Sequence, residues 1–228
     1  MRTSRRRLIA LGLASGTMAL SPPAMATEPQ NLVDEARITA ERFLNDANYK
    51  PMRVYVENAY GVLIVPDMLK GGVLIGGQYG NGVFLGRDAQ TGLWSDPAFF
   101  TVAGGSLGLQ IGGEKVAAIY TFMNPRAVDR LLSAQFKIGA NAGGALGPVG
   151  SGVGAGTTLN FGEDVYLFSQ NEGLFGGLAV DGTVIRPRND WNAAYYGQRL
   201  TAAQIVRQKA GGAGQPAAAD LKNVLSRF

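Results

Sequence analysis

The chain has no cysteine and no histidine. Without cysteine it can form no disulfide, and no lipid can be attached through an N-terminal Cys. Without histidine it lacks Ser-His and Cys-His catalytic pairs, an imidazole general base and the usual zinc sites. These absences exclude most enzyme mechanisms. We therefore expect a protein that is not an enzyme and that uses no cofactor or metal.

Most of the excess positive charge belongs to the first 26 residues. The chain has 21 Lys+Arg and 17 Asp+Glu, and four of the arginines but none of the acidic residues precede residue 27. The remainder therefore has 17 of each, and the pI of about 9.4 does not indicate nucleic-acid binding. One asymmetry remains at the C-terminal end, where an anionic surface is the expected partner. From Ile185 to the end of the sequence only Asp190 and Asp220 are acidic. The basic residues of this segment are Arg186, Arg188, Arg199, Arg207, Lys209, Lys222 and Arg227.

Residues 1–26 have the pattern of an export signal peptide. Four arginines lie within the first seven residues, an apolar stretch covers residues 8–20, and Ala24-Met25-Ala26 supplies small residues for cleavage. The apolar stretch is shorter than the ~20 residues of a membrane span. Ser4 to Ile9 also resembles a twin-arginine signal, which would indicate a bacterial source; general secretory export stays open as the alternative. We expect a periplasmic, envelope-associated or secreted protein.

Glycine doublets recur where the flanking residues favour strands. Glycine weakens an ordinary strand, so a sheet that keeps so many usually bends sharply or lets another backbone or a ligand approach closely. We expect Gly108, Gly112, Gly143, Gly147 and Gly150 to be structural. The doublets are Gly71-Gly72, Gly76-Gly77, Gly104-Gly105, Gly112-Gly113, Gly143-Gly144 and Gly176-Gly177.

The hydrophobic pattern predicts helices at both ends and strands between them. An amphipathic helix over residues 31–47 has mainly acidic residues on its polar face, which favours packing on the core over a membrane surface. Strands follow from Val62 onward, with hairpins predicted at Asn81-Gly82 and Gly112-Gly113. The fold class is α+β: a strongly curved, mainly antiparallel sheet or partly closed barrel flanked by N- and C-terminal helices.

One domain is expected over residues 27–209, since this length suits a single core. Short helices are predicted over residues 126–132 and from Thr201. Residues 210–228 are predicted to form a Gly/Ala-rich linker followed by a short amphipathic segment.

A nucleotide site is not indicated by the glycines. Residues 150–155 satisfy G-x-G-x-x-A, but that fingerprint must open a helix, and here it continues into the strand-like run Thr157-Thr158-Leu159. Adjacent carboxylates such as Glu163-Asp164 are read as solvated strand ends.

Aromatic and basic residues cluster in two places and form the candidate lipid-binding set. Tryptophan and tyrosine suit a membrane interface, and arginine pairs with phosphate through two parallel hydrogen bonds. The alternative is that these rings fill the core beneath loops. The candidates are Trp94, Phe99, Lys137, Arg186, Arg188, Trp191, Tyr195 and Tyr196.

Four strings between residues 94 and 177 point to a known family. They are Trp94-Ser95-Asp96-Pro97-Ala98-Phe99, the glycine-rich run from Gly104 to Gly112, residues 139–143 leading to Gly147-Pro148-Val149-Gly150, and Gly173-Leu174-Phe175-Gly176-Gly177. In this order they resemble the SYLF domain family from Ala59 to Ile205. The resemblance implies a module that binds phosphoinositides or other anionic lipids, with actin bundling in some eukaryotic members. This sequence has no SH3 or FYVE companion, so actin binding is not expected.

Together these patterns predict an exported, non-catalytic protein that contacts anionic lipid headgroups through basic and aromatic surface residues. Two alternatives remain open. The first is a lipid carrier whose curved sheet encloses an acyl chain. The second is a structural or adhesion protein of the envelope that binds a protein partner.

Overall fold

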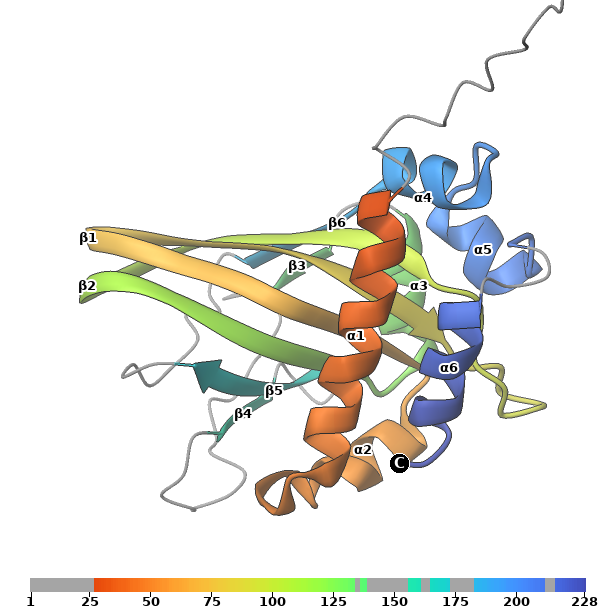
Figure 1. Ribbon diagram of the computed structural model, residues 1–228, viewed down its shortest axis with the longest axis horizontal. Coiled ribbons are helices and arrows are strands. Elements are labelled where there is room, and N and C mark those ends of the chain that lie inside the picture. The colour runs from red at the N-terminus through yellow and green to blue at the C-terminus, as the bar shows by residue number, and fades with distance from the viewer. Residues whose placement is uncertain (1–26, 134–135, 139–155, 161–164, 173–182, 212–215) are drawn as a thin grey trace, which may run out of the picture.

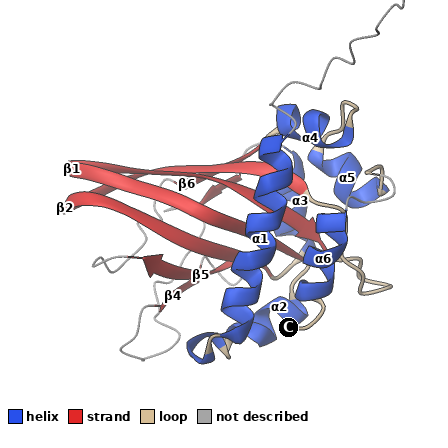
Figure 2. Cartoon of the chain, in the orientation of Figure 1, coloured by secondary structure: helices blue, strands red, loops and turns tan. Residues whose placement is uncertain are grey.

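Two long strands, β1 (Gly61–Gly86) and β2 (Ala98–Phe122), dominate the fold and pair antiparallel along nearly their whole length. The computed structural model describes residues 27–133, 136–138, 156–160, 165–172, 183–211 and 216–228. In that part of the chain six strands form one antiparallel sheet, with helices packed on it (Figures 1 and 2). The predicted α+β class with a curved antiparallel sheet is confirmed.

The β1–β2 ribbon turns back on itself, so that both strands fold over at the same end (Figure 1). Near the bend the pairing register shifts. Val73 pairs with Ile111 and Ile75 pairs with Leu107, so a step of two residues in β1 corresponds to a step of four in β2. An insertion of this kind bends a strand and increases its twist. Glycine faces glycine on both sides of the shift: Gly71 pairs with Gly113, Gly72 with Gly112, and Gly77 with Gly105.

Glycine also lets the two halves of β1 pack closely. A Cβ atom on Gly82 would lie 2.8 Å from the carbonyl oxygen of Ile64, and one on Gly80 would lie 2.8 Å from that of Asp67. Both contacts involve backbone atoms, which cannot move aside as the end of a flexible side chain can. The folded ribbon therefore requires glycine at these two positions.

The two predicted hairpins are wrong. Asn81-Gly82 and Gly112-Gly113 lie inside continuous strands and are not turns. Glycine serves a turn, a bend or a close approach equally well, so the local sequence did not distinguish them. Gly112 pairs with Gly72, and Gly108 lies in the shifted stretch of β2; the structural role of both stays a prediction. Gly143, Gly147, Gly150 and residues 1–26 lie outside the described residues.

The other strands extend the sheet from β2. One half of β2 pairs with β6 (Thr183–Pro187) and the other with β5 (Val165–Glu172). Beyond them, β3 (Phe136–Ile138) pairs with β6 and β4 (Gly156–Asn160) pairs with β5. The sheet order is therefore β3-β6-β2-β5-β4, with β1 paired to β2.

Two hydrophobic clusters stabilise this arrangement. The first joins side chains from both halves of the folded ribbon, such as Leu63, Phe84 and Phe100, to α3 (Pro125–Ser133) and α5 (Ala202–Gln208). The second cluster lies between the sheet and the remaining helices. These are α1 (Thr27–Asn45), the 3-10 helix η2 (Ala47–Tyr49), α2 (Met52–Asn58), α4 (Asn189–Tyr196) and α6 (Pro216–Leu225).

The helices agree with the sequence in part. Helix α1 buries Val33, Ala36 and Phe43, which confirms core packing for it. Thr201 caps α5 through a capping box with Gln204, as its position before the apolar residues suggested. Helix α6 begins at Pro216, inside the stretch predicted to be a linker, because proline is well suited to a first helical turn. Helix α4 was not predicted.

Candidate functional site

Most of the aromatic residues predicted to contact lipid belong to the core. Trp94, Phe99 and Tyr195 are buried, and the ring of Phe99 lies 5.1 Å from that of Tyr195 and 6.1 Å from that of Trp191. The structure corrects the prediction for Trp94, Phe99 and Tyr195, because their rings pack against protein and are not accessible to a headgroup at the surface. Trp191 and Tyr196 are partly buried, and the Tyr196 hydroxyl donates to the Pro97 carbonyl.

Two of the predicted basic residues share one face of the sheet. Lys137 on β3 pairs with Val184 of β6, and Arg186 lies two residues further along β6. Alternate residues of a strand face the same side, so Lys137 and Arg186 project together. Both are exposed. The structure thus brings together two cations from separate parts of the sequence.

Arg188 is held by its own chain. Its guanidinium donates to the Asp190 carboxylate at 2.7 Å and lies over the Trp191 ring, 4.5 Å from the ring centre. The hydrogen bond raises the pKa of Arg188 and lowers that of Asp190. The charge of Arg188 is therefore balanced within its own chain segment.

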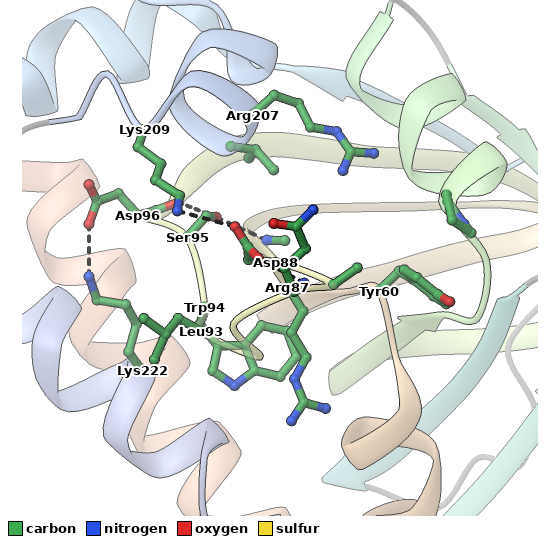
Figure 3. A pocket seen from close by; sticks show the side chains of 15 residues that line it. Tyr60, Arg87, Asp88, Leu93, Trp94, Ser95, Asp96, Arg207, Lys209 and Lys222 are labelled. Atoms are coloured by element: carbon green, nitrogen blue, oxygen red, sulfur yellow. Dashed lines mark hydrogen bonds and ion pairs between the residues drawn. The ribbon is translucent and has the colours of Figure 1, made fainter.

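A second basic group surrounds a half-open cavity of about 450 Å³ (Figure 3). We call it the basic cavity and define it by its charged lining residues. The cations come from the end of β1, from α5 and its C-terminal cap, and from α6, so the fold gathers them from distant parts of the chain. Three of them belong to the basic C-terminal segment that the sequence revealed. The lining includes Arg87, Arg207, Lys209 and Lys222, with Asp88 and Asp96.

Arg87 opens a tight turn on one side of the basic cavity. It forms a β-bridge with Trp94, and its guanidinium lies 5.5 Å from the centre of the Trp94 ring. The same guanidinium donates to the carbonyl oxygens of Gly92 and Glu57. These partners are uncharged, so the contacts fix the position of Arg87 without neutralising it.

Asp88 joins this turn to the end of α5. Its carboxylate accepts the backbone N–H groups of Thr91 and Gln90, and Lys209 approaches it at 3.1 Å. The N–H of Thr91, followed by Lys209, holds the pKa of Asp88 well below its usual range. Lys209 has a left-handed backbone with φ of 54°, the only positive φ of a non-glycine residue in the described ranges. This conformation ends α5 and directs the ammonium group to Asp88 (Figure 3).

Two further ion pairs fix the helices that line the basic cavity. Lys222 of α6 donates to Asp96 at 2.9 Å (Figure 3), and Arg207 of α5 pairs with Asp129 of α3. Asp96 is the least exposed of these charged groups, at 13% of its side chain. The Lys222–Asp96 pair therefore joins α6 to the loop that leads into β2.

This arrangement can bind an anion. Ion pairs between exposed groups contribute only about 0–1 kcal/mol, so a phosphate can compete with Asp88 or Asp129 for Lys209 and Arg207. Arginine and lysine both bind phosphate oxygens with charge-assisted hydrogen bonds. Among residues the structure describes, no group of acidic side chains is placed to hold a metal ion. In the same ranges no helix has the length and apolar character needed to cross a bilayer.

Sequence reasoning missed Arg87 and Leu93 as site residues. Nothing in linear spacing places residue 87 beside residues 209 and 222, because the contact depends on the docking of α5 and α6. The available signal was Asp88-Ala89-Gln90-Thr91-Gly92, a composition typical of a capped turn, followed by an apolar residue in a polar loop. That signal fits a surface turn displaying Leu93, which is 67% exposed.

Comparison with known proteins assigns the chain to a family. The model of the Ysc84 family, described as "Las17-binding protein actin regulator", matches residues 103–228. The chain belongs to the Ysc84 family. The SYLF resemblance predicted from the sequence is confirmed. The match extends to Phe228, so α6 lies within the family's own region and not beyond it.

Relatives within the Ysc84 family are longer proteins. The "SH3 domain-containing protein PJ696.02" of Schizosaccharomyces pombe is 32% identical over 72% of this chain and 37% of its own length. "Protein YSC84" of Saccharomyces cerevisiae is 30% identical over 66% of this chain and 32% of its own length. The mouse "SH3 domain-containing YSC84-like protein 1" is 30% identical over 73% of this chain and 48% of its own length. This chain thus spans a third to a half of these relatives, and no solved structure matches it.

Proposed function

We propose that this protein binds membrane surfaces that contain anionic lipids, with the basic cavity as its headgroup site. The observation that supports it best is the convergence of Arg87, Arg207, Lys209 and Lys222 on one half-open cavity lined by only two carboxylates. The resemblance to the SYLF family, whose members include lipid-binding modules, agrees with this reading. The function is non-catalytic and needs no cofactor.

The cavity suits a headgroup better than a flat contact would. Its cations lie on separate elements and line the cavity from several sides (Figure 3). Arg87 is the best placed of them, since carbonyl groups and the Trp94 ring orient it without neutralising it. Lys209 and Arg207 are partly exposed and can exchange a carboxylate partner for a lipid phosphate at little cost.

Vesicle flotation tests this proposal. The chain from Thr27 and the full chain are compared in parallel, because the arginines of the first seven residues would add affinity of their own. Near an anionic surface each basic residue contributes about 1 kcal/mol, so the Arg207→Gln, Lys209→Gln double variant should bind anionic vesicles roughly 25-fold more weakly. Its dependence on salt should also be shallower.

A matched control removes charge elsewhere. Lys50→Gln alters an exposed cation in the turn before α2, which does not line the cavity, and should change binding little. Equal losses in Lys50→Gln and in Lys209→Gln alone would mean that net charge, not the cavity, determines binding. The Lys137→Gln, Arg186→Gln double variant shows in the same assay whether the sheet face contributes.

Export is a further part of the proposal. The signal-like pattern of residues 1–26 supports it. Cell fractionation with N-terminal sequencing of the mature protein would test it. Protein kept in the cytosol with Arg2 to Arg7 still attached would refute it.

A protein partner is the second candidate function. Relatives carry the names "Protein YSC84" and "LAS seventeen-binding protein 3", and the family is described as an actin regulator. Pull-down of one stoichiometric protein, without vesicle binding, would favour this candidate. The sequence-based prediction that actin is not a partner stays a prediction, and co-sedimentation with filaments would test it.

The lipid-carrier alternative receives less support. In the described residues the space inside the folded ribbon is occupied by buried side chains such as Leu63, Phe84 and Phe122. Native mass spectrometry of the purified protein would reveal a retained lipid if the alternative were correct.

A further inference from the structure

The turn beside the basic cavity displays an apolar residue that the core does not use. Leu93 is 67% exposed, more than Val54, Leu69, Tyr79 or Ile38, which are also large, hydrophobic and exposed. Single exposed hydrophobic residues are common and need no explanation by themselves. Leu93 differs because of the turn that carries it and the charges that lie behind it.

The tip of this turn has no charge. Ala89, Gln90, Thr91, Gly92 and Leu93 follow each other without an ionisable side chain, and Ala89 to Thr91 are exposed. The cations Arg87 and Lys209 lie at its base, next to the cavity (Figure 3). An uncharged, partly apolar tip above a basic base matches a bilayer interface, where apolar groups meet the acyl boundary and cations meet phosphates.

Most backbone N–H groups of the turn find acceptors within the turn itself. Asp88 accepts the N–H groups of Gln90 and Thr91 through its carboxylate and that of Gly92 through its carbonyl. The Thr91 hydroxyl accepts from the N–H of Leu93, and the Leu93 carbonyl accepts from the N–H of Asp88. Unsatisfied backbone groups are what makes an irregular loop costly to place in lipid. The internal hydrogen bonds reduce this cost for the N–H groups of the turn.

The turn is also held in one shape before any contact. Gly92 has φ of 72°, a left-handed conformation that favours glycine, and Arg87 donates to its carbonyl oxygen. The Arg87–Trp94 bridge closes the base, and the Ser95 hydroxyl accepts the N–H of Gly86 beneath it. Because the turn is ordered in advance, inserting Leu93 requires little loss of conformational freedom.

We propose that the 88–93 turn inserts Leu93 into the interface of an anionic bilayer while the basic cavity behind it contacts the phosphates. This inference rests on the proposed lipid-binding function and adds an apolar anchor and an orientation to it. The anchor gives a part of the binding that salt does not screen, whereas the contribution of the cations falls as salt rises.

Labelling can test the insertion directly, because the chain has no cysteine. Leu93→Cys carries a polarity-sensitive NBD probe, and Val54→Cys on α2, 60% exposed, carries the same probe as the control. Vesicles are phosphatidylcholine with and without phosphatidylglycerol, and a spin-labelled lipid serves as quencher. We expect a blue shift and quenching at position 93 with phosphatidylglycerol vesicles, and neither at position 54.

Binding at high salt gives the second readout. Burying a leucine contributes about 1.5–3 kcal/mol, so Leu93→Ser should weaken binding at high salt by about tenfold or more. Val54→Ser should not change it. Both side chains are exposed, so the unfolding midpoint should stay close to that of the unaltered protein in each variant.

The outcomes separate this inference from the proposed function. If the unaltered protein floats with anionic vesicles but the probe at 93 neither shifts nor is quenched, insertion is wrong and headgroup binding stands. If Leu93→Ser binds as tightly as Val54→Ser at high salt, the anchor is likewise excluded. If the unaltered protein does not float with anionic vesicles at all, the proposed function fails and the insertion fails with it.

Discussion

At the residue scale, the bend of the sheet depends on positions where no side chain fits. Gly80 and Gly82 lie where one half of β1 passes the other, and the carbonyl oxygens of Asp67 and Ile64 lie only 2.8 Å from where a Cβ would be. Gly105, near the bend, has open space in the same direction. The glycines of this sheet therefore differ in what they allow, and only some of them are required for close packing.

A substitution pair tests this difference. Gly82→Ala forces a contact of 2.8 Å with the Ile64 carbonyl oxygen, so we expect the free energy of unfolding to fall by about 1–3 kcal/mol or more, as in overpacked cores. Gly105→Ala meets nothing within 4 Å and should change it by less than about 0.5 kcal/mol. Urea unfolding measures both. Similar losses in the two variants would show that glycine acts here through backbone freedom and not through space.

At the element scale, α6 is joined to the rest of the molecule by apolar and ionic contacts. Its residues Leu221, Val224 and Leu225 are buried in the same cluster as α1, and Lys222 reaches the largely buried Asp96. Lys222→Met leaves that carboxylate without its cation, and a lost hydrogen bond to a charged group costs about 1.5–3 kcal/mol. We expect stability to fall by that amount.

Adding Asp96→Asn to Lys222→Met should recover part of the loss, because the second change removes the charge that the first one left unpaired. A thermodynamic cycle over the two single variants and the double variant measures this coupling. Strictly additive effects would mean that α6 is fixed by its apolar residues alone.

The same scale shows what sequence patterns can and cannot specify. The helical spacing of α1 and the capping residues of α5 are local features, so both helices were predictable. The continuous strands β1 and β2 were divided wrongly, because Gly82 and Gly112 mark a close approach and a bend whose causes lie in distant residues. The basic C-terminal segment was recognised as a charge pattern. The sequence did not predict that this segment lies beside Arg87 and Leu93, because that contact depends on how α5 and α6 dock.

At the scale of the whole molecule, missing residue types determine how stability responds to pH. With no histidine or cysteine, no imidazole or thiol titrates between about pH 7 and 9, so stability should be nearly constant there. Burial raises the pKa of Tyr49 to about 12, and burial raises those of Tyr195 and Tyr196 as well. The folded protein thus keeps protons that the unfolded chain releases above about pH 10.

Stability from these tyrosines is complete below about pH 10 and is lost as pH rises through the higher pKa values of the folded state. Urea unfolding midpoints from neutral to alkaline pH should show a plateau followed by a fall. Tyr196→Phe should make the fall shallower, because it removes one of the buried hydroxyl groups that stay protonated in the folded state. A steep change in the urea unfolding midpoint between pH 7 and 9 would contradict this prediction.

The fold places the basic cavity and the 88–93 turn on the same surface of the molecule. The folded ribbon positions the end of β1, α5 and α6 around the basic cavity, and the 88–93 turn adds Leu93 beside it (Figure 3). Flotation of the chain from Thr27 with phosphatidylcholine vesicles, with and without phosphatidylglycerol, over a salt series tests its role most directly. We expect the protein to bind only the anionic vesicles, and we expect both salt and the Arg207→Gln, Lys209→Gln double variant to weaken this binding. Equal binding to neutral vesicles, or full binding by that variant, would contradict it.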